Sequence, residues 1–459
     1  MTSTIKVNNV QNQCGQNIIN ENSNTITIGA SGDTIALASG ASQTGFGREG
    51  SVNWQTGSIK TATFTAANGE GYFCNTSGGA FTLTLPASPS AGDIVAVADY
   101  TRTFATNNLT IGRNSQPIGG VAADAILDVN GLSATFIYVD GTEGWINVQE
   151  TETSLTGTTF VAATGGTITT VGNDKIHTFT SPGTFCVSQI ATCSANNQVS
   201  YMVVGGGGGG GDSGGGGGGA GGFREDKSPV TGCYTASPLE GAGAISVTQT
   251  AFPITVGAGG AAGTTGTPAT GFNGANSVFS TITSAGGGGG GSRSGAAPGP
   301  TPRSGLAGGS GGGGGGTCGP TPNPPGGSGN TPPVSPPQGQ NGGNGVSSSN
   351  HQGGGGGGAG AVGSAGTCSP DAGGPGGAGV TTSINNSPVA RAGGGGGGNQ
   401  GPTAGTGGSG GGGAGGLPGS DATAGTANTG GGGGGAGFRP SPSSKNGGSG
   451  IVIIRYKFQ

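Results

Sequence analysis

The 459-residue chain is poor in charged residues, aromatic residues and long apolar runs, and each shortage excludes a class of protein. Charged residues make up 7% of the chain, the net charge is −4 and lysine and arginine form no cluster, so we expect no nucleic-acid partner. The longest purely aliphatic run, Ile451 to Ile454, is far shorter than a membrane span, so we expect no membrane insertion. No aromatic residue lies between Phe279 and Phe438, which excludes a conventional buried core in that part.

Groups able to perform acid–base or nucleophilic chemistry are also scarce. Between Gly241 and Gln459 the only carboxylates are Asp371 and Asp421, and the only histidine is His351. The other histidine, His177, alternates within a predicted strand, which is typical of a hydrogen-bonded strand residue rather than a catalyst. We therefore predict no catalytic residue, no cofactor and no enzymatic activity.

Seven cysteines are an odd number spread over a long chain, which does not predict a disulfide framework. Cys186, Cys193 and Cys233 have an unusual spacing for zinc, so we predict no metal site and thiols that are free and mostly buried. The sequence leaves open whether any of the cysteines pair.

Glycine is what the chain has in abundance, with 116 residues concentrated after Gly205. Uninterrupted runs of six glycines recur at residues 214–219, 286–291, 311–316, 353–358, 393–398 and 430–435. Low-complexity drift would give scattered lengths, so equal lengths predict a layer of fixed thickness. A polyproline II helix rises about 3.1 Å per residue, which makes each run roughly 19 Å long. We predict a slab of such polyglycine II helices over residues 205–448, with a disordered linker as the alternative.

Predicted strands lie directly before and after the glycine-rich region. Tyr201 to Val204 leads into it and Ile451 to Tyr456 leads out, so we expect both in one small sheet. This predicts a β-domain over residues 153–204 that residues 449–459 complete.

Residues 61–152 read as eight short strands separated by glycine- and proline-containing turns, which predicts a β-sandwich or barrel. Trp145, Tyr138, Phe136 and Phe81 are its predicted core. Residues 1–60 contain Ile26, Ile28, Ile35 and Leu37 in alternation, and we interpret them as an N-terminal attachment segment and trimerising shaft. An ordinary hairpin at the edge of the next domain is the alternative.

These segments together predict a mainly β chain with essentially no α-helix. The expected architecture is a set of small antiparallel β-sandwich or β-prism-like domains in a homotrimeric fibre, with a distal polyglycine II slab.

The stretch from Gly69 to Asp93, GEGYFCNTSGGAFTLTLPASPSAGD, resembles a recurrent β-domain of bacteriophage tail-fibre or virion appendage proteins of the marine phage and cyanophage type. YMVVGGG from Tyr201 and GGSGIVIIRY from Gly447 resemble the entry and exit of their glycine-rich module. The resemblance implies a structural protein of the virion. It implies partners in other tail or capsid proteins, through the N-terminal region, and in a glycan or outer-membrane protein of the host surface.

Under this hypothesis the connectors between glycine runs attach the virion to the host. We expect the contacts in residues 292–307, 317–352 and 367–392. The polar side chains singled out there as receptor contacts are Arg293, Arg303, Asn323, His351, Asp371 and Arg391. The alternatives are a spacer or capsid decoration protein that binds no receptor, and an ice-binding protein.

Overall fold

The computed structural model describes residues 9–11, 17–22, 25–28, 52–149, 158–241, 243–264, 270–293, 303–317, 322–438 and 443–459. It divides into two compact units, one of residues 1–120 and 126–155 and one of residues 121–125 and 156–459. Both units contain β-sheets, and the described residues contain no α-helix, as predicted.

The N-terminal segment contributes three short antiparallel strands: β1 (Asn9–Gln11), β2 (Asn17–Asn22) and β3 (Thr25–Ile28). β3 contains the predicted Ile26 and Ile28 and pairs with β2. The predicted strand residues Ile35 and Leu37 lie outside the described residues. The trimerising role of this segment stays a prediction.

Residues 52–149 form two facing sheets, which confirms the predicted sandwich and not a closed barrel. Trp145 and Phe136 from one sheet and Leu83 and Ile111 from the other are essentially inaccessible to solvent. One sheet has the order β12 (Gly144–Asn147), β11 (Ser133–Asp140), β8 (Ile94–Asp99), β6 (Glu70–Cys74), β4 (Asn53–Trp54). The other has the order β10 (Ala125–Leu127), β9 (Leu109–Gly112), β7 (Phe81–Thr84), β5 (Phe64–Thr65).

The pairing within this sandwich differs in part from the antiparallel prediction. β4, β6 and β8 are parallel to one another, and so are β5, β7 and β9, whereas β8, β11 and β12 are antiparallel. Parallel neighbours need a crossover connection, usually a helix. Here each crossover is itself a strand of the opposite sheet, because the chain alternates between the two sheets from β4 to β9.

The second unit begins with two further sheets. One contains, in order, β14 (Thr167–Val171), β15 (Asp174–Phe179), β27 (Ile451–Lys457), β17 (Gln198–Val204) and β18 (Phe223–Asp226), with β19 (Ile245–Ser246) also paired to β17. The other contains β13 (Ala162–Thr164), β16 (Gly183–Gln189), β20 (Ala251–Thr255), β21 (Ser277–Phe279) and β22 (Ile282–Ser284).

The strands that enter and leave the glycine region are direct neighbours, as predicted, since Val204 of β17 pairs with Ile451 of β27. Apolar side chains between the two sheets, including Phe185, Phe279 and Tyr456, form one buried cluster. The predicted base at residues 153–204 and 449–459 was incomplete, because β18 to β22 come from within the glycine-rich region.

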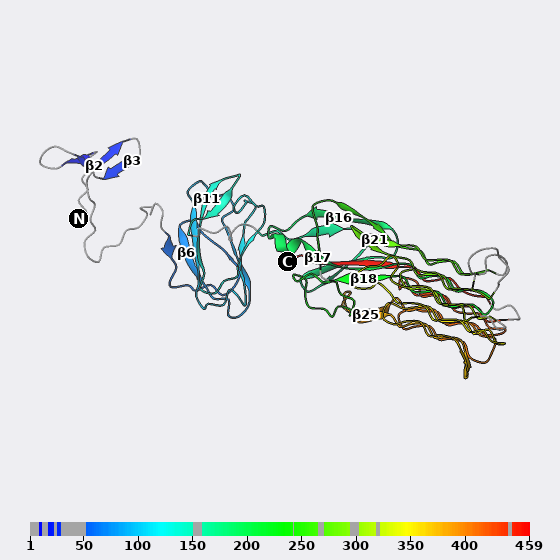
Figure 1. The fold of residues 1–459 in the computed structure, drawn as a ribbon. Helices are drawn as coiled ribbons and strands as arrows, with labels where there is room; N and C mark the ends of the chain where they lie inside the picture. Colours follow the sequence, from blue (N-terminus) through cyan, green and yellow to red (C-terminus); the bar gives the residue numbers. More distant parts are fainter. Residues whose placement is uncertain are drawn as a thin grey trace. The chain divides into compact units, whose positions relative to one another are not determined.

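The glycine segments extend side by side away from these sheets (Figure 1). Backbone hydrogen bonds join them with a period of three residues, as residues 206–211 show. Gly206 and Gly209 donate to Ala275 and Phe272, Gly207 and Gly210 to Gly448 and Lys445, and Gly208 and Gly211 to Gly219 and Gly216. A helix with three residues per turn points successive amides at three different neighbours, so this period is the one that the predicted polyproline II helices would give.

The arrangement is a bundle with a central run rather than a flat slab. Residues 214–222 lie at its centre, and residues 214–221 form backbone hydrogen bonds with six other glycine-rich runs. The six runs around the centre are 205–211, 286–292, 310–317, 352–359, 392–399 and 430–437. Every residue of these surrounding runs is buried. The uninterrupted glycine runs are therefore the interior of the bundle.

Outer segments surround this interior, and only one side of each is covered. In residues 405–409, for example, Gly405 and Gly408 are buried whereas Thr406 and Ser409 are exposed, again with a period of three. The outer segments are 257–264, 271–276, 303–309, 322–330, 340–346, 360–366, 373–379, 403–409, 410–416, 422–428 and 443–450.

Alanines mark the end of the bundle nearest the sheets. Ala220, Ala359 and Ala392 are fully buried in a second apolar cluster with Met202 and Phe223. The glycine runs span the distance between this cluster and the turns at the opposite end, so the equal run lengths reflect a common thickness.

Candidate functional site

The turns at the end of the bundle farthest from the sheets, which we call the distal connectors, gather most of its charged side chains. Run 205–211 leaves β17, turns at Asp212 and Ser213 and returns to β18, so this turn lies at the distal end. The other distal connectors include residues 347–351, 367–372, 399–403 and 417–421, and the described ends at 293, 303, 317, 322, 438 and 443.

Aromatic and cationic side chains stack at this distal end. The His351 ring lies on the Phe438 ring, with centroids 4.4 Å apart and an angle of 22°. The Arg293 guanidinium lies 4.2 Å from the centre of the Phe438 ring. His351 Nδ1 is 2.8 Å from Gln400 Oε1. Burial and the nearby charge of Arg293 hold the pKa of His351 below its ordinary value, against the opposing hydrogen bonds.

A second distal cluster surrounds the carboxylate of Asp371. Asn350 donates to Oδ2 at 2.5 Å, and Gln352 and Asn399 donate to Oδ1 at 2.7 and 3.1 Å. Burial raises the pKa of Asp371, but the three amide hydrogen bonds outweigh it, so the pKa lies below its ordinary value. The carboxylate is therefore held in its charged form.

The remaining predicted contact residues divide between the two ends of the bundle. Arg303 is half-buried at the start of an outer segment, and its carbonyl accepts a hydrogen bond from Gly315. Asn323 is exposed and accepts a hydrogen bond from the backbone of Ser347. Arg293, Arg303, Asn323, His351 and Asp371 are thus brought to the distal end. Their binding to a receptor stays a prediction.

Arg391 does not lie with them. It ends β26 (Val389–Arg391), which pairs with β25 (Val380–Thr382) beside the sheets, and it is 5% exposed. Its Nη1 lies 3.9 Å from the Met202 sulfur. The expectation that Arg391 belongs to an exposed connector was therefore wrong, because residues 380–391 form a hairpin at the opposite end of the bundle. His351 is also only 5% exposed, so its side chain serves the stack rather than the outer surface.

The predicted connectors were also too long. Residues 292–307, 317–352 and 367–392 include outer segments of the bundle, whose glycines bond to the interior runs. Only the turns within these ranges are distal.

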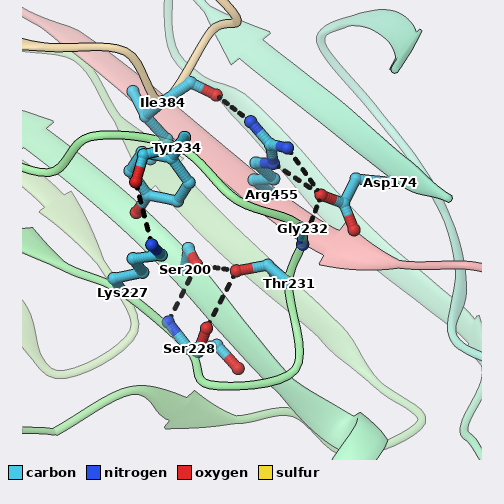
Figure 2. Close-up of polar contacts among 9 residues, drawn as sticks. All are labelled: Asp174, Ser200, Lys227, Ser228, Thr231, Gly232, Tyr234, Ile384 and Arg455. Atoms are coloured by element: carbon cyan, nitrogen blue, oxygen red, sulfur yellow. Dashed lines mark hydrogen bonds and ion pairs between the residues drawn. The ribbon is translucent and has the colours of Figure 1, made fainter. Parts of the chain in front are cut away.

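A buried polar cluster fixes the opposite end of the bundle to the sheets (Figure 2). Arg455 of β27 forms an ion pair with Asp174 of β15, with Nη2 2.7 Å from Oδ2, and both side chains are at most 3% exposed. Arg455 also donates to the carbonyl of Ile384 and lies 5.0 Å from the centre of the Tyr234 ring. The amide of Gly232 donates to Asp174 at 2.8 Å.

This cluster joins the exit strand, loop 227–234 and the turn after β25. Ser200 of β17 extends it, since its hydroxyl bonds to Thr231 and accepts from the amide of Ser228. Lys227 donates to the carbonyl of Tyr234. The chemistry is that of a structural clamp, because the ion pair is closed to solvent.

Other reactive groups do not converge in the described part of the chain. His177 is a hydrogen-bonded strand residue, as predicted, with Nδ1 2.7 Å from the Gly165 carbonyl and Nε2 3.2 Å from the Tyr456 hydroxyl. Within the described ranges, no group of three or more His, Cys, Asp or Glu residues is placed to hold a metal.

The described cysteines are free, and Cys186, Cys193, Cys233 and Cys368 are exposed, so the prediction of mostly buried thiols was wrong for this part. A cavity of about 660 Å³ beside the β25–β26 hairpin has no charged residue in its lining. A helix long and apolar enough to cross a membrane does not occur in the parts of the chain that the structure describes.

Sequence reasoning missed Phe438 and the amides of Asn350, Gln352, Asn399 and Gln400. Each of these residues flanks or lies near a six-glycine run, and this position in the sequence could have identified them.

No curated protein is significantly similar to the chain. The family model for a glycine-rich domain matches residues 179–457, from β15 through the whole bundle to β27. This range contains both sheets' central strands, the interior runs and the distal connectors. The chain therefore belongs to the glycine-rich domain family.

Proposed function

We propose that the chain is a non-enzymatic virion fibre or appendage protein, and that the distal connectors of its glycine bundle attach the particle to a host cell surface. The observation that supports this most is the distribution of side chains. The sides of the bundle carry mostly uncharged residues such as Thr406 and Ser409, whereas charged side chains such as Arg293 and Asp371 gather at the distal end.

The physics of the bundle fits this role. Each interior glycine is held by backbone hydrogen bonds worth about 1 kcal/mol each, so the bundle can carry a rigid end face without an apolar core. Connecting turns on such a scaffold can vary without disturbing it, as binding loops do on other folds. Partners in the virion, a homotrimer and the virion location are parts of this proposal that rest on the sequence resemblance.

Tryptophan substitutions at matched serines test the distal connectors. Ser349, Ser369 and Ser420 are exposed in distal connectors, and Ser328, Ser364 and Ser409 are exposed on the sides of the bundle. Changing the first three to Trp should reduce adsorption of particles to host cells at least tenfold. Changing the second three should leave adsorption within twofold of the parent.

The alternative function is a spacer or capsid decoration protein without a receptor. It predicts that neither triple variant changes adsorption, provided that both assemble into particles. Locating the chain on purified particles by antibody labelling and electron microscopy separates the two functions further. A distal tail position supports attachment, and a position on the capsid contradicts it.

A further inference from the structure

We propose that Asp371 is a positioning residue that holds three distal connectors together as one preformed binding face. The proposal rests on the proposed function of the distal connectors and names the residue that shapes them. The three connectors are 347–351 with the adjoining Gln352, 367–372 and 399–403, and each contributes at least one side chain to the cluster.

The geometry of the carboxylate is the first argument. One Asp371 oxygen accepts from Asn350, and the other accepts from both Gln352 and Asn399. Hydrogen bonds to a charged acceptor are roughly twice as strong as those between neutral groups. A single side chain thus makes the strong bonds that cross between three turns.

Backbone contacts around the cluster provide the second argument. The backbone N–H of Gln400 donates to the Asn350 carbonyl at 3.0 Å, and the backbone N–H of Gly401 donates to Asn399 Oδ1 at 3.0 Å. A Cβ at position 401 would overlap the Asp371 carboxylate, so a glycine is required for this approach. The turn 399–403 is therefore shaped to fit against Asp371.

The cluster continues into the aromatic stack. His351 lies between Asn350 and Gln352 in the chain and contacts Gln400 and Phe438. Side chains therefore join four distal connectors, namely the three above and the one that begins at Phe438. A ligand would meet this composite face in one arrangement and would not have to order separate loops, which lowers the entropic cost of binding.

Charge exchange within the cluster tests the proposal. The variants are Asp371→Asn, Asn399→Asp and the double variant that carries both changes. Asn399→Asp places two carboxylates about 3 Å apart, where they repel each other. The double variant restores one carboxylate and one amide across the same contact.

Hydrogen exchange in the purified full chain is the first readout, and it does not depend on the proposed function. We expect exchange in residues 347–352 and 399–403 to become at least tenfold faster in each single variant, and to recover in part in residues 399–403 in the double variant, where the 371–399 contact is restored. Asp421→Asn is the matched control, because Asp421 is a distal carboxylate bonded to Lys445 and not to the cluster. Unchanged exchange in both single variants would overturn the proposal.

Adsorption of particles to host cells is the second readout. Asp371→Asn should weaken adsorption with unchanged thermal stability, and the double variant should restore it. If exchange responds as expected but adsorption stays constant, Asp371 does not position a binding face. If the distal Trp variants also leave adsorption constant, the proposed function itself fails.

Discussion

A methyl group at the centre of the bundle should disrupt it, and Gly217→Ala is the sharpest test. A Cβ at Gly217 would lie 2.1 Å from the carbonyl oxygen of Gly395 and 2.4 Å from its carbonyl carbon. Both atoms belong to backbone, so no side chain can turn away to make room. Gly217 also donates to Gly354 and accepts from Gly313, and moving the runs apart weakens both hydrogen bonds.

The expected destabilisation follows from these contacts. Overpacking a core costs about 1–3 kcal/mol, and two weakened backbone hydrogen bonds add about 1 kcal/mol each. We therefore expect Gly217→Ala to destabilise the bundle by about 3 kcal/mol or more. Ala261→Ser, on an exposed position of an outer segment, adds one atom without a clash and should change stability by less than about 0.5 kcal/mol.

Calorimetry of the purified chain measures the difference, with hydrogen exchange to assign the affected transition to the bundle. The Gly217→Ala transition should occur at lower temperature than in the parent and should lose exchange protection in the interior runs. Equal transition temperatures for Gly217→Ala, Ala261→Ser and the parent would refute the close packing of the central run.

Three further outcomes follow from the structure. Arg455→Met leaves the Asp174 carboxylate buried without its cation and should cost about 3–5 kcal/mol in unfolding free energy, whereas a change below 1 kcal/mol would exclude the clamp. Burial lowers the pKa of His177, so the unfolded chain binds a proton at a higher pH than the folded chain does. The parent should therefore lose stability as pH falls below about 6.5. In thermal melts at different pH, His177→Gln should reduce the dependence of stability on pH. Asn273→Ala removes the side-chain acceptor of the Gly289 amide and should speed exchange of that amide, while unchanged exchange would contradict the contact.

The alternation of apolar and polar residues made two parts of the fold predictable, namely the strands of the sandwich and the sheets from which the glycine bundle extends. The apolar residues of β17 and β27 are strong strand formers on either side of the glycine region, and their pairing could be inferred from that position alone. Parallel pairing of β4, β6 and β8 could not, because alternation reports which face is buried and not the direction of a neighbour.

The bundle was predictable in thickness but not in arrangement. Run length reports how far a segment extends, whereas the choice of centre depends on contacts between segments distant in the chain. Asn273 and Asn276 illustrate the limit. Their side chains, on outer segment 271–276, accept the amides of Gly289 and Gly286 in place of backbone carbonyls. The three-residue spacing of these asparagines matches the period of the bundle. That match could be recognised only once the contacts between the segments were known.

Only the ionisable residues of the candidate site could be predicted from the sequence. Asp371 and His351 were identified because the second half of the chain has so few ionisable groups. Their amide partners are common residue types in a polar sequence, and only their position beside six-glycine runs marked them. Arg391 was wrongly assigned to an exposed connector, because strands as short as β25 and β26 give no clear alternating pattern in the sequence.

Hydrogen exchange of the glycine amides distinguishes an ordered bundle from an unstructured linker. We expect strong protection throughout the interior runs, centred on residues 214–222. We expect weaker protection in outer segments, where one side faces solvent. Exchange of all these amides at the rate of an unstructured chain would contradict an ordered bundle, and with it a rigid support for the distal connectors.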